Sequence, residues 1–169
     1  MCGKDKILTL YNLLGALNTL FIMVSVLGVY SQLGTIWRRK QMVSKTERPT
    51  ALLSLNQFTV SFFAYLSFFI YGYSIEPFNH YIVWPRLLAA MLVMGILFEI
   101  WQDRKSRAAR VSVVLAGACL ILAGAGLVLG KTIADQSRYI ATLLIVLVSV
   151  FIAQGYYHQI RLILKAGQT

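Results

Sequence analysis

Five long apolar segments, separated by short polar loops, are the feature that most limits how this chain of 169 residues can fold. Each segment reaches the length of about 20 residues that a helix needs to cross the hydrocarbon core of a bilayer. The segments are Ile7 to Trp37, Thr50 to Tyr73, Tyr81 to Trp101, Ala109 to Gly130 and Tyr139 to Leu164. We therefore expect an all-α protein, a polytopic membrane helix bundle with five transmembrane helices.

Positive charge is concentrated in alternate loops. Of the 16 lysines and arginines, nine lie in the loops after the first and third segments: Arg38, Arg39, Lys40, Lys45, Arg48, Arg104, Lys105, Arg107 and Arg110. The loop over residues 74–80 contains none. Because loops rich in lysine and arginine stay on the cytoplasmic side, this pattern predicts an integral membrane protein with its N-terminus outside and its C-terminus in the cytoplasm.

Composition narrows the class further. A chain with 58% hydrophobic and 13% charged residues is too apolar for a soluble domain of this size. Most of the net charge of +10 comes from the basic loops that orient the protein in the membrane. This charge is also compatible with anionic membrane lipids, so we expect membrane lipids as partners and no nucleic acid. Two distant histidines and two distant cysteines form no metal or disulfide pattern, and no catalytic or nucleotide-binding motif occurs. We predict neither an enzyme nor a bound cofactor or metal.

Polar residues in the first two segments follow a helical period. In the first segment they recur every seven residues, at Tyr11, Asn18, Ser25 and Gln32. In the second they recur every three or four residues, at Ser54, Gln57, Ser61 and Tyr65. Either spacing keeps the side chains on one face of a helix. Two such stripes predict a hydrated cavity between the helices, with the first stripe facing the bundle interior, or interhelical hydrogen bonds that hold the bundle together.

Four ionisable residues lie within the apolar segments, where a charge is unfavourable unless it is paired or hydrated. Arg86 either extends to the outer headgroups or faces a pocket. Glu99, near the cytoplasmic interface, predicts an ion pair with a basic loop residue. His158 is either a structural hydrogen-bonding residue or a group that titrates near neutral pH. Arg161 is expected at the interface.

Small residues recur every seven positions in the fourth segment, at Ala109, Ala116, Ala123 and Gly130. Such a face lets a neighbouring helix approach closely. We expect this segment to be a packing or linker helix.

A short internal repeat links the first and last segments. Residues 29–41 align without a gap to residues 156–168, and the alignment places Tyr30 and Gln32 on Tyr157 and Gln159. Internal repeats are common in transporters.

The stretches YSQLGTIWRRKQ, LLSLNQF and FFAYLSFFIYG, with the basic loop between them, resemble a PQ-loop repeat. This is the three-helix unit of the SWEET and SemiSWEET sugar transporters and of the lysosomal cystine transporter. The resemblance implies a PQ-loop repeat over residues 1–102, a linker transmembrane helix over 103–135, and the first helix of an incomplete second repeat over 136–169. Two more helices would complete the seven of the family.

The chain departs from the family pattern at three places. Ser31 and His158 replace the prolines of the Pro-Gln pairs, which bears on the transport cycle because those prolines kink the family's helices. The third helix has Pro85 and Arg86 where the family has Pro-Asn, with the asparagine in the solute pocket. An arginine at that position favours an anion over a neutral sugar.

Together these features predict a transporter-like membrane protein that moves a small polar solute, a sugar, amino acid or small organic acid, by alternating access. The expected solute-binding residues are Asn18, Ser25, Gln32, Gln57, Ser61, Arg86, His158 and Gln159. The alternative is a non-transporting membrane subunit that keeps the PQ-loop fold and assembles with a second copy or with another membrane protein. A third interpretation is a piece of a seven-helix transporter.

The topology is testable by labelling single cysteines introduced at Ser44 and Pro77 in intact cells. We expect a membrane-impermeant thiol reagent to label position 77 and to leave position 44 unlabelled. Labelling at 44 alone would mean that the orientation is reversed.

Overall fold

A computed structural model of the chain describes residues 2–42, 49–50, 53–129, 139, 142–150, 152–154 and 157, with the side chains of the first helix described from Thr9 onward. Helix accounts for 91% of the described part, which contains no strand, so the predicted all-α class is confirmed. The helices are α1 (Cys2–Met42), α2 (Leu55–Ser74), α3 (His80–Arg104) and α4 (Arg107–Leu129).

Three helices in the described part are long and apolar enough to span a membrane: residues Thr9–Met42 of α1, all of α3 and all of α4. The 20 residues of α2, which include Asn56, Gln57 and three tyrosines, are not among them. The fifth predicted segment is helical over residues 142–150 and 152–154. Its end, including His158 and Gln159, lies outside the described residues, so five spans remain a prediction.

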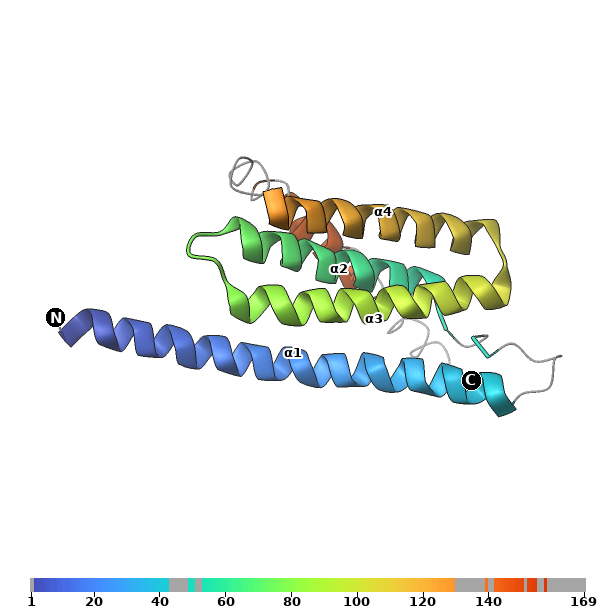
Figure 1. Cartoon of the computed structure of the whole chain (residues 1–169), viewed down its shortest axis with the longest axis horizontal. Helices are drawn as coiled ribbons and strands as arrows, with labels where there is room; N and C mark the ends of the chain where they lie inside the picture. The colour runs from blue at the N-terminus through green and yellow to red at the C-terminus, as the bar shows by residue number, and fades with distance from the viewer. Residues whose placement is uncertain are drawn as a thin grey trace.

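Helix α3 occupies the centre of the bundle. It packs against α1, α2 and α4, and α2 and α4 also pack against each other. Helix α1 lies along α3, and its backbone does not approach that of α2 or α4 (Figure 1). Apolar residues on α3 are accordingly buried on more than one side, among them Val83, Ala89, Val93 and Ile100. The core of the bundle is therefore built around α3.

Helix α2 begins at Leu55, so the expected start of the second span at Thr50 is wrong. Ser54 caps the helix, because its hydroxyl accepts a hydrogen bond from the Gln57 N–H at 3.3 Å. Thr50 is held by α3 instead. Its backbone N–H donates to Asp103 Oδ2 at 3.0 Å, and its carbonyl accepts from Arg104 at 2.7 Å. These bonds keep Thr50 outside the helix.

Helices α3 and α4 are joined by a short turn and run antiparallel (Figure 1). Lys105 ends α3 in a left-handed conformation with φ of 48° and donates its N–H to the Trp101 carbonyl at 2.8 Å. The hydroxyl of Ser106 accepts from the Ala109 N–H at 3.2 Å and so caps α4. Three of the four residues of the predicted small face, Ala109, Ala116 and Ala123, are buried as expected, and Gly130 lies outside the described residues.

The seam between α1 and α3 uses apolar residues at alternating spacings of three and four. On α1 the buried residues Ile22, Val26, Leu33 and Ile36, with the half-buried Val29 between them, follow this series, and the spacing is the one by which two helices interlock side chains along their length. Toward the N-terminal end of α1 the approach is closer. A Cβ atom added to Gly15 would lie 2.6 Å from the ring of Tyr81 on α3, so glycine is what allows this contact.

Pro85 within α3 removes one helical hydrogen bond, because proline has no N–H to donate to the carbonyl of Tyr81 four residues earlier. A side chain of α1 replaces that donor. The hydroxyl of Thr19 lies 3.1 Å from the Tyr81 carbonyl oxygen and 3.0 Å from that of Gly15, within hydrogen-bonding distance of both. Helix α1 thus satisfies the carbonyl that Pro85 leaves open.

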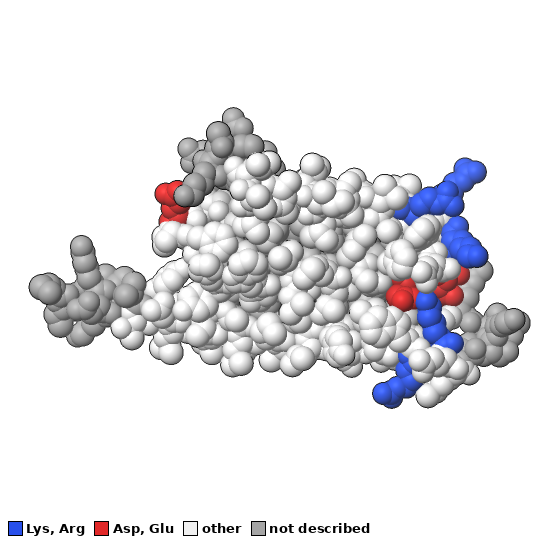
Figure 2. Space-filling view, in the orientation of Figure 1, with Lys and Arg blue, Asp and Glu red and all other residues white. Residues whose placement is uncertain are grey.

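At the opposite end of the seam the contacts are charged. On the face drawn in Figure 2, the visible lysine and arginine side chains gather at this end of the molecule, which we call the basic end. Glu99 of α3 forms an ion pair with Lys40 of α1 and accepts a hydrogen bond from Trp37 Nε1 at 2.9 Å. Lys40 also donates to Gln102 at 3.1 Å. The ion pair predicted for Glu99 is confirmed.

We expect Thr19→Val to destabilise the bundle by about 1 kcal/mol, because the valine leaves the Tyr81 carbonyl without a donor at a helix interface. Thr35→Val is the matched control, since the Thr35 hydroxyl bonds only within α1, to the Ser31 carbonyl at 2.9 Å. Unfolding of both variants in detergent, followed by circular dichroism, measures the difference. Equal losses would show that the bond between the helices contributes nothing.

Candidate functional site

Side chains from three helices meet in a polar group that we call the central cluster: Ser25 of α1, Tyr65 and Phe68 of α2, and Arg86 of α3. The hydroxyls of Ser25 and Tyr65 are 3.2 Å apart. The guanidinium of Arg86 lies over two rings, 4.7 Å from the ring centre of Phe68 and 5.5 Å from that of Tyr65. The cluster is the place where α1, α2 and α3 share polar side chains.

Arg86 is held by aromatic faces and has no acidic partner among the described residues. A cation over a ring face is attracted by the negative potential of that face. In the part of the chain that the structure describes, the single ion pair is the one between Lys40 and Glu99. The Nε atom of Arg86 is buried and has no hydrogen-bond partner among the described residues. A guanidinium carries five N–H donors and no acceptor, so this cluster offers hydrogen-bond donors and a positive charge.

Extension of Arg86 to the outer headgroups, one of the two expectations from the sequence, is not what the structure has. The side chain turns toward α2 and lies over Phe68 and Tyr65. The sequence could not show this, because the two rings belong to another helix. Whether Arg86 contacts a solute stays a prediction.

The polar stripe of α1 lies beside the packed seam of the described helices and not within it, and whether it faces the interior of a five-helix bundle stays a prediction. Asn18, Ser25 and Gln32 are all exposed. The seam with α3 is made instead by apolar residues that directly follow the stripe in sequence, such as Val26 and Leu33. A rotation of one residue moves a side chain by about 100° around a helix, which places the stripe on the flank of the seam.

The second stripe contributes one residue to the contact with α1. Ser54 is a helix cap, Gln57 is exposed in the first turn of α2, and Ser61 is half-buried. Only Tyr65 reaches across, where its hydroxyl meets that of Ser25. The two stripes therefore meet at a single pair of side chains in the described part, and the other two predicted site residues, His158 and Gln159, lie outside it.

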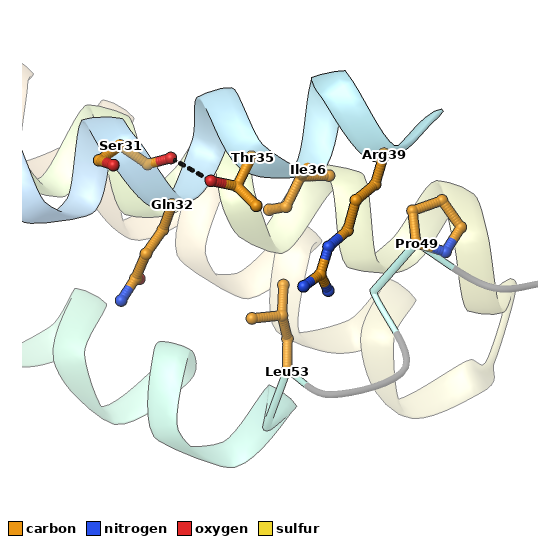
Figure 3. A pocket seen from close by; sticks show the side chains of 7 residues that line it. All are labelled: Ser31, Gln32, Thr35, Ile36, Arg39, Pro49 and Leu53. Atoms are coloured by element: carbon orange, nitrogen blue, oxygen red, sulfur yellow. Dashed lines mark hydrogen bonds between the residues drawn. The ribbon is translucent and has the colours of Figure 1, made fainter. Parts of the chain in front are cut away.

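A second feature, which we call the basic-end hollow, lies between the last turns of α1 and the chain that leads into α2. It has a volume of about 230 Å³ and is lined by Ser31, Gln32, Thr35, Ile36, Arg39, Pro49 and Leu53 (Figure 3). Gln32 and Arg39 both extend from α1 toward the side where Leu53 lies (Figure 3). The hollow thus combines one amide and one cation with apolar walls.

Arg39 is a site residue that the sequence reasoning missed, because it was counted among the cations of the basic loop. A signal was present. The spacing of seven that joins Tyr11, Asn18, Ser25 and Gln32 reaches Arg39 at its next step, and α1 continues as helix to Met42. A longer first helix would have placed Arg39 on the polar stripe.

Metal chemistry finds no support in the described residues, where no group of three or more histidine, cysteine, aspartate or glutamate side chains is placed to hold an ion. No protein-family model, curated protein or solved structure matches the chain. The central cluster and the basic-end hollow are therefore the features of the described structure that bear on function.

The contact between Ser25 and Tyr65 can be measured by a double-mutant cycle. We expect Ser25→Ala and Tyr65→Phe to show a coupling of about 0.6 kcal/mol, the average for hydrogen bonds between membrane helices. Ser31→Ala combined with Tyr65→Phe is the control and should be additive, because Ser31 lies near the basic end of α1. Chemical unfolding in bicelles gives the four free energies of each cycle. A coupling of zero would mean that this hydrogen bond does not hold α1 to α2.

Proposed function

We propose that the chain is a transporter-like membrane protein with a PQ-loop repeat, and that it passes a small polar solute which Arg86 contacts. One observation carries the proposal. Arg86 lies between α2 and α3, its Nε atom is buried, and no hydrogen-bond partner satisfies that atom in the described part of the chain. A solute with hydrogen-bond acceptors would supply the missing partner.

The orientation follows from the charge distribution. Because membrane proteins keep their lysines and arginines on the cytoplasmic side, we assign the basic end in Figure 2 to the cytoplasm. Arg86 is the seventh residue of α3 counted from the other end, which corresponds to a depth of about 9 Å at 1.5 Å per residue. A cation at such a depth is stabilised by pairing, by aromatic faces or by water, and a polar passage would supply the water.

The chemistry of the central cluster favours an acidic solute over a neutral one. Arg86 brings a permanent positive charge and donors only, while the hydroxyls of Ser25 and Tyr65 can donate or accept. A carboxylate matches the planar fork of an arginine with two parallel hydrogen bonds. Among the three solute classes we therefore place a small organic acid first, ahead of an amino acid and a sugar.

Pro85 supports a moving part in α3. Ser31 and His158 stand at the positions where PQ-loop transporters have prolines. The chain has a proline, Pro85, directly before Arg86 instead. A proline within a helix is the usual cause of a kink. We propose that flexing at Pro85 changes the exposure of the Arg86 side chain during the cycle.

The second candidate function is a non-transporting subunit, and one observation favours it. Helix α1 is apolar on the sides that no described helix covers, with Leu13, Leu20, Phe21 and Val24 each at least 60% exposed. In its most apolar stretch of 18 residues, only 11% of the residues are buried in the described structure. This face is suited to a second copy of the chain or to another membrane protein.

The experiment that tests the proposal is uptake into proteoliposomes that contain the purified chain. We expect the wild type to take up a labelled small organic acid, and Arg86→Gln to reduce uptake at least about tenfold, the effect of losing one charge-assisted hydrogen bond. The melting temperature in detergent should fall by only a few degrees. Arg110→Gln, at an exposed cation of α4, is the matched control and should transport normally.

The outcomes separate the two functions. Loss of uptake and of thermal stability together in Arg86→Gln would make Arg86 a structural residue. If the wild type takes up neither sugars, amino acids nor organic acids, transport is excluded for this chain and the subunit function replaces it.

A further inference from the structure

We propose that the basic-end hollow binds one anionic phospholipid, with Arg39 holding the phosphate group and Gln32 holding an ester oxygen of the same lipid. This site lies away from the central cluster and does not depend on the solute proposed above. It also differs from general attraction of the basic loops to membrane lipid, because it assigns the lipid to two named side chains and one hollow.

The charge of Arg39 is available for a ligand. Two neighbouring cations are already engaged, since Lys40 pairs with Glu99 and Arg104 donates to the carbonyls of Thr50 and Leu53. Arg39 is exposed and has no acidic partner in the described part of the chain. Its guanidinium extends into the hollow between Ile36 and Leu53 (Figure 3). Arginine binds phosphate through two parallel N–H groups, which makes a phosphate group the matching anion.

The order of groups along α1 matches the order of groups in a phospholipid. Gln32 lies two turns, about 10 Å, before Arg39 and therefore closer to the middle of the bundle. In a phospholipid the ester oxygens likewise lie between the phosphate and the acyl chains. Gln32 offers an amide N–H for an ester oxygen, while the lining residues Ile36, Pro49 and Leu53 are apolar.

The path beyond Gln32 has room for an acyl chain. Gly28, one turn further from the basic end, has no atom within 4 Å of the position that a Cβ would take. Phe21, about two turns beyond Gly28 on the same face, is 66% exposed. Trp37, which lies between Gln32 and Arg39 in sequence, is also exposed on α1, and aromatic rings of this kind mark the level of the headgroups. An apolar surface that continues along α1 from the phosphate-binding arginine can hold an acyl chain, so the site suits a lipid better than a free phosphorylated solute.

The test uses the purified full-length chain in a neutral detergent, titrated with phosphatidylglycerol and followed by native mass spectrometry and by its melting temperature. We expect a saturable complex with one lipid and a rise in melting temperature. Arg39→Gln should weaken binding about tenfold, since a charge-assisted bidentate contact is lost, and Gln32→Leu should weaken it by a smaller factor. Arg38→Gln, the adjacent cation that does not line the hollow, is the matched control and should bind as the wild type does.

Each other outcome would overturn a stated part of the proposal. Equal weakening in Arg38→Gln and Arg39→Gln would mean that diffuse charge at the basic end attracts the lipid and that no site exists. The same rise in melting temperature with soluble glycerol phosphate would replace the lipid by a free phosphorylated solute. Equal binding of phosphatidylcholine would remove the preference for an anionic lipid, and binding unchanged in both Arg39→Gln and Gln32→Leu would exclude the hollow.

Discussion

The contact between α1 and α3 is the interaction on which the central cluster and the basic-end hollow both depend. Near one end, the hydroxyl of Thr19 donates a hydrogen bond to the Tyr81 carbonyl, which lacks a helical donor. At the other end, Glu99 forms an ion pair with Lys40 and accepts a hydrogen bond from Trp37. Between these ends, apolar residues of α1 pack on small residues of α3, as Leu33 does beside Gly95. Since the backbone of α1 approaches that of no other helix of the four, this seam sets where Ser25 meets Tyr65 and where Arg39 borders the hollow.

Properties that are local along the chain were predictable from the sequence. Hydrophobic length depends on neighbouring residues only, so the all-α class and the presence of each described helix followed from it. The small face of α4 and the ion pair of Glu99 were predictable for related reasons. Alanines that recur every seven residues on a helix indicate close packing with a neighbouring helix. An acidic residue close in sequence to several cations is expected to pair with one of them in any fold.

Properties that depend on which helices are neighbours were not predictable. On α1 a polar and an apolar series with the same period run one residue apart, as Ser25 and Val26 do, and nothing in the series says which one meets α3. The bonds that keep Thr50 out of α2 come from Asp103 and Arg104, more than 50 residues away. The rings over which Arg86 lies belong to α2. The amino-acid composition of a helix does not reveal which other helix it packs against, so this contact could not be predicted.

The length and continuity of α1 have a mechanical consequence. Its 41 residues contain no proline, so it is a single rod of about 60 Å, roughly twice the thickness of a hydrocarbon core. The other three helices brace one another, because α4 packs against both α2 and α3. A rod attached along one side to a braced body works as a lever, in which a small tilt at one end appears as a displacement at the other. A change in the tilt of α1 would therefore alter the hollow near Arg39 and the distance between Ser25 and Tyr65 together, because both lie along the same helix.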